Sequence, residues 1–262
     1  MKLDERLRTL RDVAAVVREP LRLAFERMRG KSTTGRYHLR RSGLVVHLRH
    51  DVLDDVATLV QTFRQGHYVL PDEARAALDA LGRPIRVMDL GANVGMFGAW
   101  LLSDHPDAHV IGYEADPANA RVHALTVDAN RNTVAWELVA AAAGARDGTV
   151  RFAAGGTTNS RLAGDDEPGG IAVPQHDVLA RANAVDLLKI DIEGAEWALL
   201  EDPRFARLAT PVVALEYHAE RCPEDDPAGA ATRALERAGY RVRPGDLDAE
   251  PGHGMVWGWR TA

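Results

Sequence analysis

Apolar residues along this 262-residue chain repeat with two different periods, and the change between them predicts where strands and helices lie. From residue 85 onward, short apolar runs alternate with segments whose apolar residues recur every three or four positions. The runs predict strands at 85–88, 109–113, 136–142, 149–152, 185–192, 211–217, 240–243 and 255–260. The segments between them predict helices after residue 95 and at 116–130, 177–182, 194–200 and 228–238, with a loop at 153–174.

The alternation of strands with helices predicts the architecture of the sheet. Such chains form a mostly parallel sheet that helices cover on both faces. No helix is predicted between the last two strands, so these two should pair antiparallel. We therefore expect a Rossmann-like, doubly wound α/β fold, with a mostly parallel seven-stranded sheet that ends in an antiparallel strand pair. We also expect the strand at 211–217 to lie beside the first strand of the sheet.

Residues 1–82 have a different pattern and are expected to form an extension in front of the sheet domain of residues 83–262. Apolar residues at helical spacing predict a helix over 3–28 that is broken or kinked at Pro20. Alternation around Ser42 and Gly43 predicts a β-hairpin at 37–50. Two further helices are expected at 51–65 and 71–81.

The charge of the chain is unevenly distributed, and its net value limits the kinds of molecule that the protein is expected to bind. The sequence has 32 Lys and Arg against 38 Asp and Glu, a formal net charge of −6, which disfavours a nucleic-acid-binding protein. Residues 1–50 contain 13 basic and 5 acidic residues, which leaves 19 basic and 33 acidic residues in the remainder. A single cysteine, Cys222, excludes an internal disulfide, and no apolar run is long enough to span a membrane. We expect a soluble, cytoplasmic protein.

A glycine-rich turn joins the first strand of the sheet to an apolar helix, as in nucleotide-binding α/β sheets. Gly91 and Gly95 allow a turn that a Cβ atom would block. The run from Asn93 to Gly98 resembles a dinucleotide fingerprint without its first glycine, so NAD has to be considered. Asp89 argues against NAD, because its carboxylate would repel a pyrophosphate but attract the sulfonium and ammonium groups of S-adenosylmethionine. These residues therefore predict an S-adenosylmethionine loop; the alternative is a turn that only packs the helix on the strand.

An acidic residue at the end of the second strand extends the predicted cofactor site. Glu114 lies 19 residues after Gly95, where a carboxylate can accept hydrogen bonds from ribose hydroxyls. The alternative is that Glu114 only stabilises the first turn of the next helix. We also assign Ala115 and Ala142 to the predicted cofactor site.

Three charged residues alternate at the end of the predicted strand 185–192. Lys189, Asp191 and Glu193 would project to one side of the strand. Burying a charge is costly unless it is paired, so we expect these residues to form ion pairs or to take part in the chemistry. Asp191 falls at the carboxyl end of the strand, where open α/β sheets bind ligands. We assign Asp191 and Lys189 to the predicted catalytic site, although Lys189 has an alternative role as a structural partner. Glu193 and Glu196 have the alternative of stabilising the next helix N-terminus.

Glu216 and His218 alternate at the end of the strand 211–217, so both should face the cleft that contains Asp191. Together the three residues offer either a general base or a site for a hard metal ion. The alternative for His218 is a surface position in a loop. We include Glu216 and His218 in the predicted catalytic site.

Three motifs stand out in the sheet domain: D-L-G-A-N-V-G at 89–95, Y-E-A-D-P at 113–117 and L-L-K-I-D-I-E-G-A-E at 187–196. Together they resemble the FkbM family of S-adenosylmethionine-dependent methyltransferases. Weaker matches at 48–55, 63–68 and 215–218 extend the resemblance over residues 37–260. The run Q-H-D at 175–177 departs from the family pattern, in which a leucine precedes the aspartate. The resemblance implies methyl transfer, commonly to a hydroxyl of a sugar or a natural product.

The function expected from the sequence is therefore S-adenosylmethionine-dependent O-methylation of a small hydroxylated acceptor. The alternatives are an RNA methyltransferase that uses the basic N-terminus and an inactive cofactor-binding scaffold. A divalent metal is compatible with Asp191, Glu216 and His218, but we favour a metal-free mechanism, because a carboxylate near a sulfonium can also orient the acceptor. Residues 1–82 are expected to form part of the acceptor pocket or a contact in a homo-oligomer.

Overall fold

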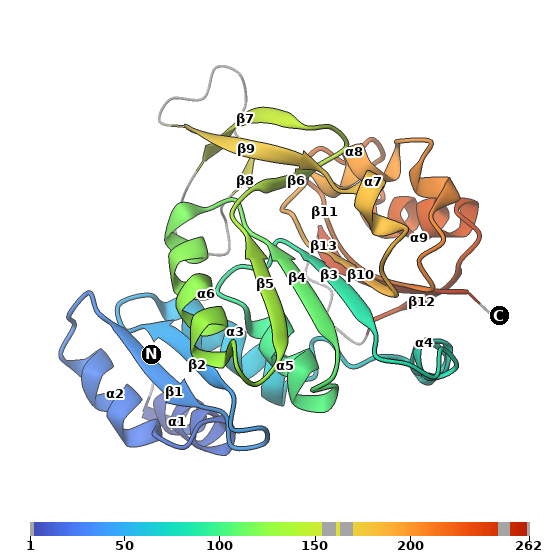
Figure 1. Ribbon diagram of the computed structural model, residues 1–262. Helices are drawn as coiled ribbons and strands as arrows, with labels where there is room; N and C mark the ends of the chain where they lie inside the picture. The colour runs from blue at the N-terminus through green and yellow to red at the C-terminus, as the bar shows by residue number, and fades with distance from the viewer. Residues whose placement is uncertain (1–2, 154–160, 163–169, 246–251, 261–262) are drawn as a thin grey trace.

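Seven strands form the central sheet, in the order β12, β13, β11, β10, β3, β4, β5 (Figure 1). The computed structural model describes residues 3–153, 161–162, 170–245 and 252–260. Strands β3, β4, β5, β10 and β11 run parallel, and β13 is antiparallel to both of its neighbours. The strands span Arg86–Leu90 (β3), His109–Tyr113 (β4), Ala135–Val139 (β5), Leu187–Ile190 (β10), Val212–His218 (β11), Arg241–Pro244 (β12) and His253–Trp259 (β13). The predicted mostly parallel, Rossmann-like sheet with a C-terminal antiparallel pair is confirmed.

Successive residues of the central strands enter two different hydrophobic cores, one on each face of the sheet. Val87 and Val110 belong to the core on the face of α5 (Met96–Asp104) and α6 (Pro117–Asn130). Met88 and Leu90 belong to the core that α7 (Leu179–Ala182), α8 (Glu196–Leu200) and α9 (Pro227–Arg237) cover. Burial on both faces explains why these strands are apolar at nearly every position instead of alternating.

The direction in which the sheet is wound reverses between β3 and β10. Strand β3 pairs with β4 on one side and β10 on the other, and β11 lies beyond β10. The expectation that the strand at 211–217 lies beside the first strand is therefore wrong, because an apolar run does not encode which strand lies next to it. The carboxyl ends of β3 and β10 flank a topological switch point, where open α/β sheets bind their ligands.

A second sheet of four strands follows β5, and two of the elements expected in this part of the chain are wrong. Its strands, in spatial order, are β6 (Ala142–Gly144), β9 (Ile171–Asp177), β7 (Gly148–Ala153) and β8 (Arg161–Leu162). The strand expected at 136–142 is divided, since β5 ends at Val139 and β6 pairs with β9. The loop expected at 153–174 instead contains β8 and part of β9, where Pro174 is tolerated because β9 pairs only with β7 at that point. Residues 154–160 and 163–169 of that loop lie outside the described residues.

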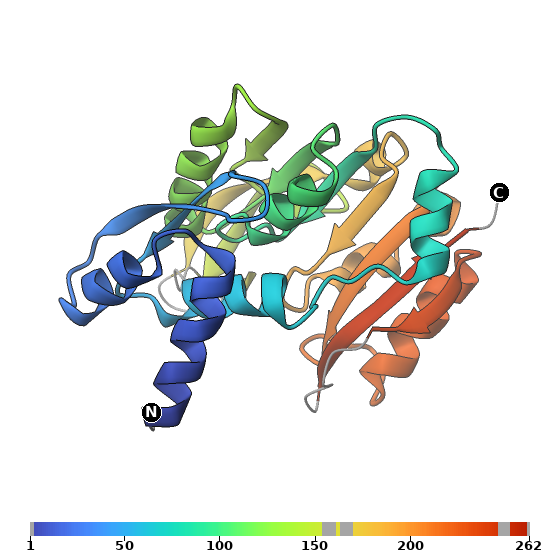
Figure 2. The same cartoon turned by 90° about the horizontal axis from the view of Figure 1, so that it is seen from below.

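The N-terminal extension contains the predicted helices and hairpin. Its elements are α1 (Leu3–Val16), α2 (Pro20–Met28), β1 (Thr34–His38), β2 (Val45–Arg49), α3 (Leu53–Arg64) and α4 (Asp72–Asp79). Figures 1 and 2 show the hairpin beside α6 and far from α9. The Asn130 side chain bonds the backbone N–H and C=O of Val45, and Leu48 and Leu59 belong to the same core as Val110. The extension thus shares a core with one face of the sheet, and a domain boundary at residue 82 stays a prediction.

None of the helices in the part of the chain that the structure describes is long and apolar enough to cross a membrane.

Candidate active site

A cavity of about 520 Å³ opens at the carboxyl ends of β3, β4, β10 and β11. Its wall combines the turn after β3, the turn after β10 and the end of β11, and residues from the N-terminal extension line the same space. Gly91, Glu114, Asp191 and His218 all line it. The topological switch point therefore brings together both groups of residues that the sequence singled out.

The glycine turn after β3 touches the turn after β10. Gly91 has a φ of +78°, and a Cβ atom at this position would lie 1.7 Å from the carbonyl oxygen of Asp191. Asn93 also has a left-handed φ of 49°, and it lines the cavity. Gly95 has a φ of +91° but packs on His123 and Trp136 below the turn, and it is not among the cavity-lining residues. Gly91 therefore lines the cavity and also packs β3 on the turn after β10, and a role of Gly95 in cofactor binding stays a prediction.

A buried ammonium group in the cavity wall links β3 to β10. Lys189 Nζ lies 3.1 Å from Asp89 Oδ1, 3.1 Å from Asp191 Oδ2 and 2.9 Å from the carbonyl oxygen of Gly91. Burial lowers the pKa of Lys189, but Asp191 and Asp89 outweigh this and raise it well above its ordinary value. Lys189 is therefore charged at neutral pH, and its three N–H groups face three acceptors. This geometry suits a positioning role better than proton transfer.

Asp89 lies deeper than the sequence suggested. Its side chain is 1% exposed, and it is not among the residues that line the cavity. Burial raises its pKa above the ordinary value, and the adjacent Lys189 offsets this only in part. Lys189 is the group that balances the negative charge of ionised Asp89. Direct contact between Asp89 and a cofactor stays a prediction.

The Glu114 carboxyl is held rigidly in the cavity wall. Its Oε2 accepts a hydrogen bond from the backbone N–H of Asn93, and its Oε1 accepts one from that of Asp116, both at 2.7 Å. Burial raises the pKa of Glu114 to about 7, against the effect of these two hydrogen bonds. Ala115 and Ala142 line the same part of the cavity. Each carboxyl oxygen retains one lone pair for a ligand donor.

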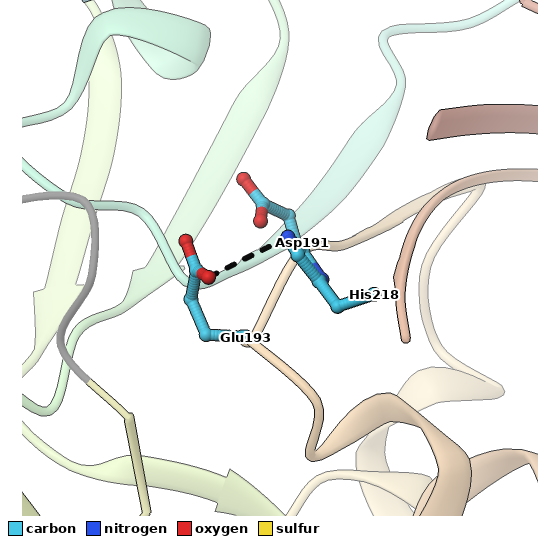
Figure 3. Close-up of side chains that lie close together, drawn as sticks. All are labelled: Asp191, Glu193 and His218. Atoms are coloured by element: carbon cyan, nitrogen blue, oxygen red, sulfur yellow. Dashed lines mark ion pairs between the residues drawn. The ribbon is translucent and has the colours of Figure 1, made fainter. Parts of the chain in front are cut away.

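Asp191, Glu193 and His218 form a cluster in which one ligand atom from each residue lies within 4.8 Å of the others (Figure 3). Glu193 lies in the turn after β10 with a left-handed φ of 52°, and its Oε2 is 3.5 Å from His218 Nε2. Burial raises the pKa of Glu193 to about 8, and the neighbouring Asp191 adds to the effect. Burial raises the pKa of Asp191 too, but Lys189 and His218 hold it below its ordinary value.

Glu196 fixes the orientation of His218 from the side away from the cavity. It is fully buried, and its Oε1 lies 2.8 Å from the backbone nitrogen and 3.2 Å from Nδ1 of His218. Burial lowers the pKa of His218, but Glu196, Asp191 and Glu193 outweigh this and raise it to about 10. This pKa favours the protonated form of His218 at neutral pH and argues against a role as a neutral base, and the side chain is buried instead of lying in a surface loop.

Glu216 contacts the N-terminal extension and not the cluster. His67 follows α3, and its Nε2 lies 3.0 Å from Glu216 Oε2. The His67 ring meets the Tyr68 ring edge-on, with centroids 4.4 Å apart, and both residues line the cavity. The extension therefore contributes to the cavity wall, and its role in an acceptor pocket stays a prediction. The pair joins residues 149 positions apart, so no local pattern could have revealed it.

Residues 89–242, more than half of the chain, match the family model of the methyltransferase FkbM domain. The chain belongs to the FkbM methyltransferase family. The match includes every predicted cofactor-binding and catalytic residue from Asp89 to His218, whereas His67 and Tyr68 lie outside it. Among curated proteins, no relative matches the sequence.

Solved structures similar to this FkbM methyltransferase include other methyltransferases. Precorrin-6y C5,15-methyltransferase from Geobacter metallireducens GS-15 is 12% identical, with a TM-score of 0.42 over 74% of this chain and 91% of that one. Magnesium protoporphyrin IX methyltransferase from Synechocystis PCC 6803, with S-adenosylmethionine bound, is 15% identical, with a TM-score of 0.44 over 78% and 84%. The bifunctional kinase-methyltransferase WbdD is 19% identical, with a TM-score of 0.45 over 71% of this chain, which spans only 38% of that one. The assignment to the family rests on the match over residues 89–242.

The structure reveals contacts of two residues of this FkbM methyltransferase that the sequence did not predict. Glu196 was visible in the sequence as an acid at the start of a helix, but its buried contact with His218 depends on β11. Asp177, which follows the position where His176 breaks the family pattern, accepts a hydrogen bond from Arg204 Nη1 at 2.6 Å, outside the cavity wall. A structural ion pair therefore accounts for Asp177.

Proposed function

We propose that this FkbM methyltransferase transfers a methyl group from S-adenosylmethionine to a hydroxyl of a small acceptor such as a sugar or a natural product. The observation that supports this most strongly is one shared cavity, in which the Gly91–Glu114 wall faces the same space as Asp191 and His67. A volume of about 520 Å³ is within the usual range for pockets that bind small molecules. The first wall would hold the cofactor and the second the acceptor.

The wall around the glycine turn fits the cofactor for two reasons. Gly91 lines the cavity and has no side chain, so a ligand can approach its backbone, while the space of a Cβ atom is taken by the carbonyl oxygen of Asp191. Glu114 keeps free lone pairs that can accept hydrogen bonds from two ribose hydroxyls. Ala115 and Ala142 would lie along the same ligand, because both line this end of the cavity.

The chemistry needs alignment and one proton acceptor. Bound S-adenosylmethionine supplies an activated methyl group, and the electron pair of the broken C–S bond stays on sulfur. Asp191 would orient the acceptor hydroxyl, whose oxygen forms the new bond to the methyl carbon. We assign its proton to Nδ1 of His67, because Glu216 accepts the Nε2–H and so leaves Nδ1 unprotonated in the neutral ring.

An acceptor screen with radiolabelled S-adenosylmethionine tests this function. We expect S-adenosylhomocysteine to form with sugars or hydroxylated natural products, and the label to resist mild alkali, as a methyl ether does. Label transferred to RNA, with binding that weakens as salt rises, would support the RNA alternative. Binding of S-adenosylhomocysteine without turnover on any acceptor would support the inactive scaffold.

Glu114→Ala is expected to weaken S-adenosylhomocysteine binding by about 1.5–3 kcal/mol, the usual contribution of hydrogen bonds to a charged group. Calorimetry measures this directly, and the wild-type protein should show no NAD binding. An unchanged affinity in the variant would refute the ribose assignment.

The affinity for S-adenosylhomocysteine should also depend on pH through Glu114. Ribose hydroxyls donate to the carboxylate form, and the free carboxyl has a pKa of about 7, so binding must displace its proton below that pH. We expect affinity to rise about tenfold from pH 6 to pH 8 in the wild-type protein. Glu114→Gln should remove this dependence, because the amide does not titrate. The same slope in wild-type and variant proteins would assign the effect to the ligand.

A further inference from the structure

The geometry points to a divalent cation site formed by Asp191, Glu193 and His218. Only the role of the cation at the acceptor rests on the proposed function. Binding of the cation itself can be measured without any acceptor. Two carboxylates and one imidazole suit a first-row ion such as Mn²⁺, which accepts both oxygen and nitrogen ligands. The mixed set is less suited to Mg²⁺, which prefers oxygen ligands and its own waters.

The spacing of the cluster is close to what one ion requires. Bonds of about 2.2 Å place neighbouring ligand atoms about 3 Å apart and opposite ones about 4.4 Å apart. Glu193 Oε2 and His218 Nε2 are 3.5 Å apart, and the three ligand atoms lie within 4.8 Å of one another (Figure 3). A contraction of a few tenths of an ångström is therefore sufficient.

His218 presents Nε2 to the two carboxylates because several groups behind it hold the ring. Fully buried Glu196 binds Nδ1, and the Trp197 indole N–H donates to the His218 carbonyl oxygen at 2.8 Å. The His253 ring lies parallel to the His218 ring at 6.0 Å and 10°. A carboxylate on the second nitrogen of a histidine is the arrangement that orients imidazole ligands in metal proteins.

The cluster is reachable from the cavity and balances the charge of a divalent ion. The side chains of Asp191 and Glu193 are 20% and 29% exposed, and all three residues line the cavity. Lys189 contacts Oδ2 of Asp191, and one carboxylate oxygen per residue suffices for the ion. If the proposed function holds, a cation here would bind the acceptor oxygen and make its proton easier to transfer to His67.

Mn²⁺ titration of the EDTA-treated full chain tests the site without any acceptor. Calorimetry and the loss of the free Mn²⁺ electron paramagnetic resonance signal should report one bound ion per chain. Glu193→Gln and His218→Gln should abolish saturable binding, and Glu196→Gln should weaken it 10–100-fold, as expected when the carboxylate behind a ligand is lost. Glu220→Gln is the matched control, because it removes a carboxylate that lines the same cavity outside the cluster.

Two results would overturn the site: no saturable Mn²⁺ binding below about 1 mM, or binding that Glu193→Gln and Glu220→Gln reduce equally. The first result would leave His218 and the carboxylates as an ion-pair network. S-adenosylhomocysteine binding and circular dichroism on the same variants show that they are folded. Methyl transfer without Mn²⁺ binding refutes the metal site alone, and Mn²⁺ binding without transfer to any hydroxyl refutes the proposed function alone.

Discussion

Asp191→Asn should lower the rate of methyl transfer by about 10²–10⁴-fold, the usual contribution of a positioned acid or base. The substitution keeps the shape of the side chain and removes the charge that faces the cavity between Lys189 and His218. The rate is measured as S-adenosylhomocysteine formation with an acceptor from the screen. Both proposed roles of Asp191, orienting the acceptor and binding a cation, predict a loss in kcat.

Cofactor affinity separates this effect from a loss of structure. S-adenosylhomocysteine should bind Asp191→Asn nearly as well as the wild-type protein, because Gly91 and Glu114 are unchanged. Glu236→Gln, on the exposed side of α9, is a matched control for the lost charge and should leave the rate unchanged. Near-normal turnover in Asp191→Asn would show that Asp191 is structural and that another group handles the acceptor.

Lys189→Met should destabilise the protein by about 3–5 kcal/mol, the cost of removing one partner from a buried ion pair. The substitution preserves most of the side-chain volume, but it leaves the buried Asp89 without its counter-charge and the partly exposed Asp191 with His218 alone. It also removes the donor to the Gly91 carbonyl oxygen, which links the two central strands. Urea unfolding followed by circular dichroism measures the change in the free energy of unfolding.

A double variant distinguishes the lost ion pair of Lys189 from the lost contacts of its ammonium group with aromatic rings. Asp89→Asn combined with Lys189→Met should recover part of the stability, because the deepest uncompensated charge is then removed. No recovery would mean that the lost contacts of the ammonium group with the rings of Tyr68 and Phe97, whose centroids lie 5.7 and 5.8 Å from Nζ, account for the destabilisation. If the free energy of unfolding of Lys189→Met lay within about 0.5 kcal/mol of the wild-type value, Lys189 would not stabilise the contact between β3 and β10.

The apolar pattern and the glycine turn determined the fold class of this chain. Strand β4 has the predicted bounds His109–Tyr113, and α6 ends at the predicted Asn130, because an apolar run or helical stripe is a local property of the sequence. Acidic residues at strand ends correctly predicted the edge of the sheet where the cavity lies, because the carboxyl ends of parallel strands meet at that edge. Glu114, Asp191 and His218 accordingly line one cavity.

The tertiary structure alone decided which charged groups meet. Asp89 and Lys189 pair across two strands, Glu216 contacts His67 from the extension, and Glu196 turns His218 toward Glu193. Each pair depends on strand order or on a turn between distant segments, which local periodicity does not encode. The pKa values follow from the same contacts, because burial and neighbouring charges set them. The sequence therefore determined the sheet and the edge where ligands bind, and the tertiary packing decided which residues hold charge, orient histidines and remain available for chemistry.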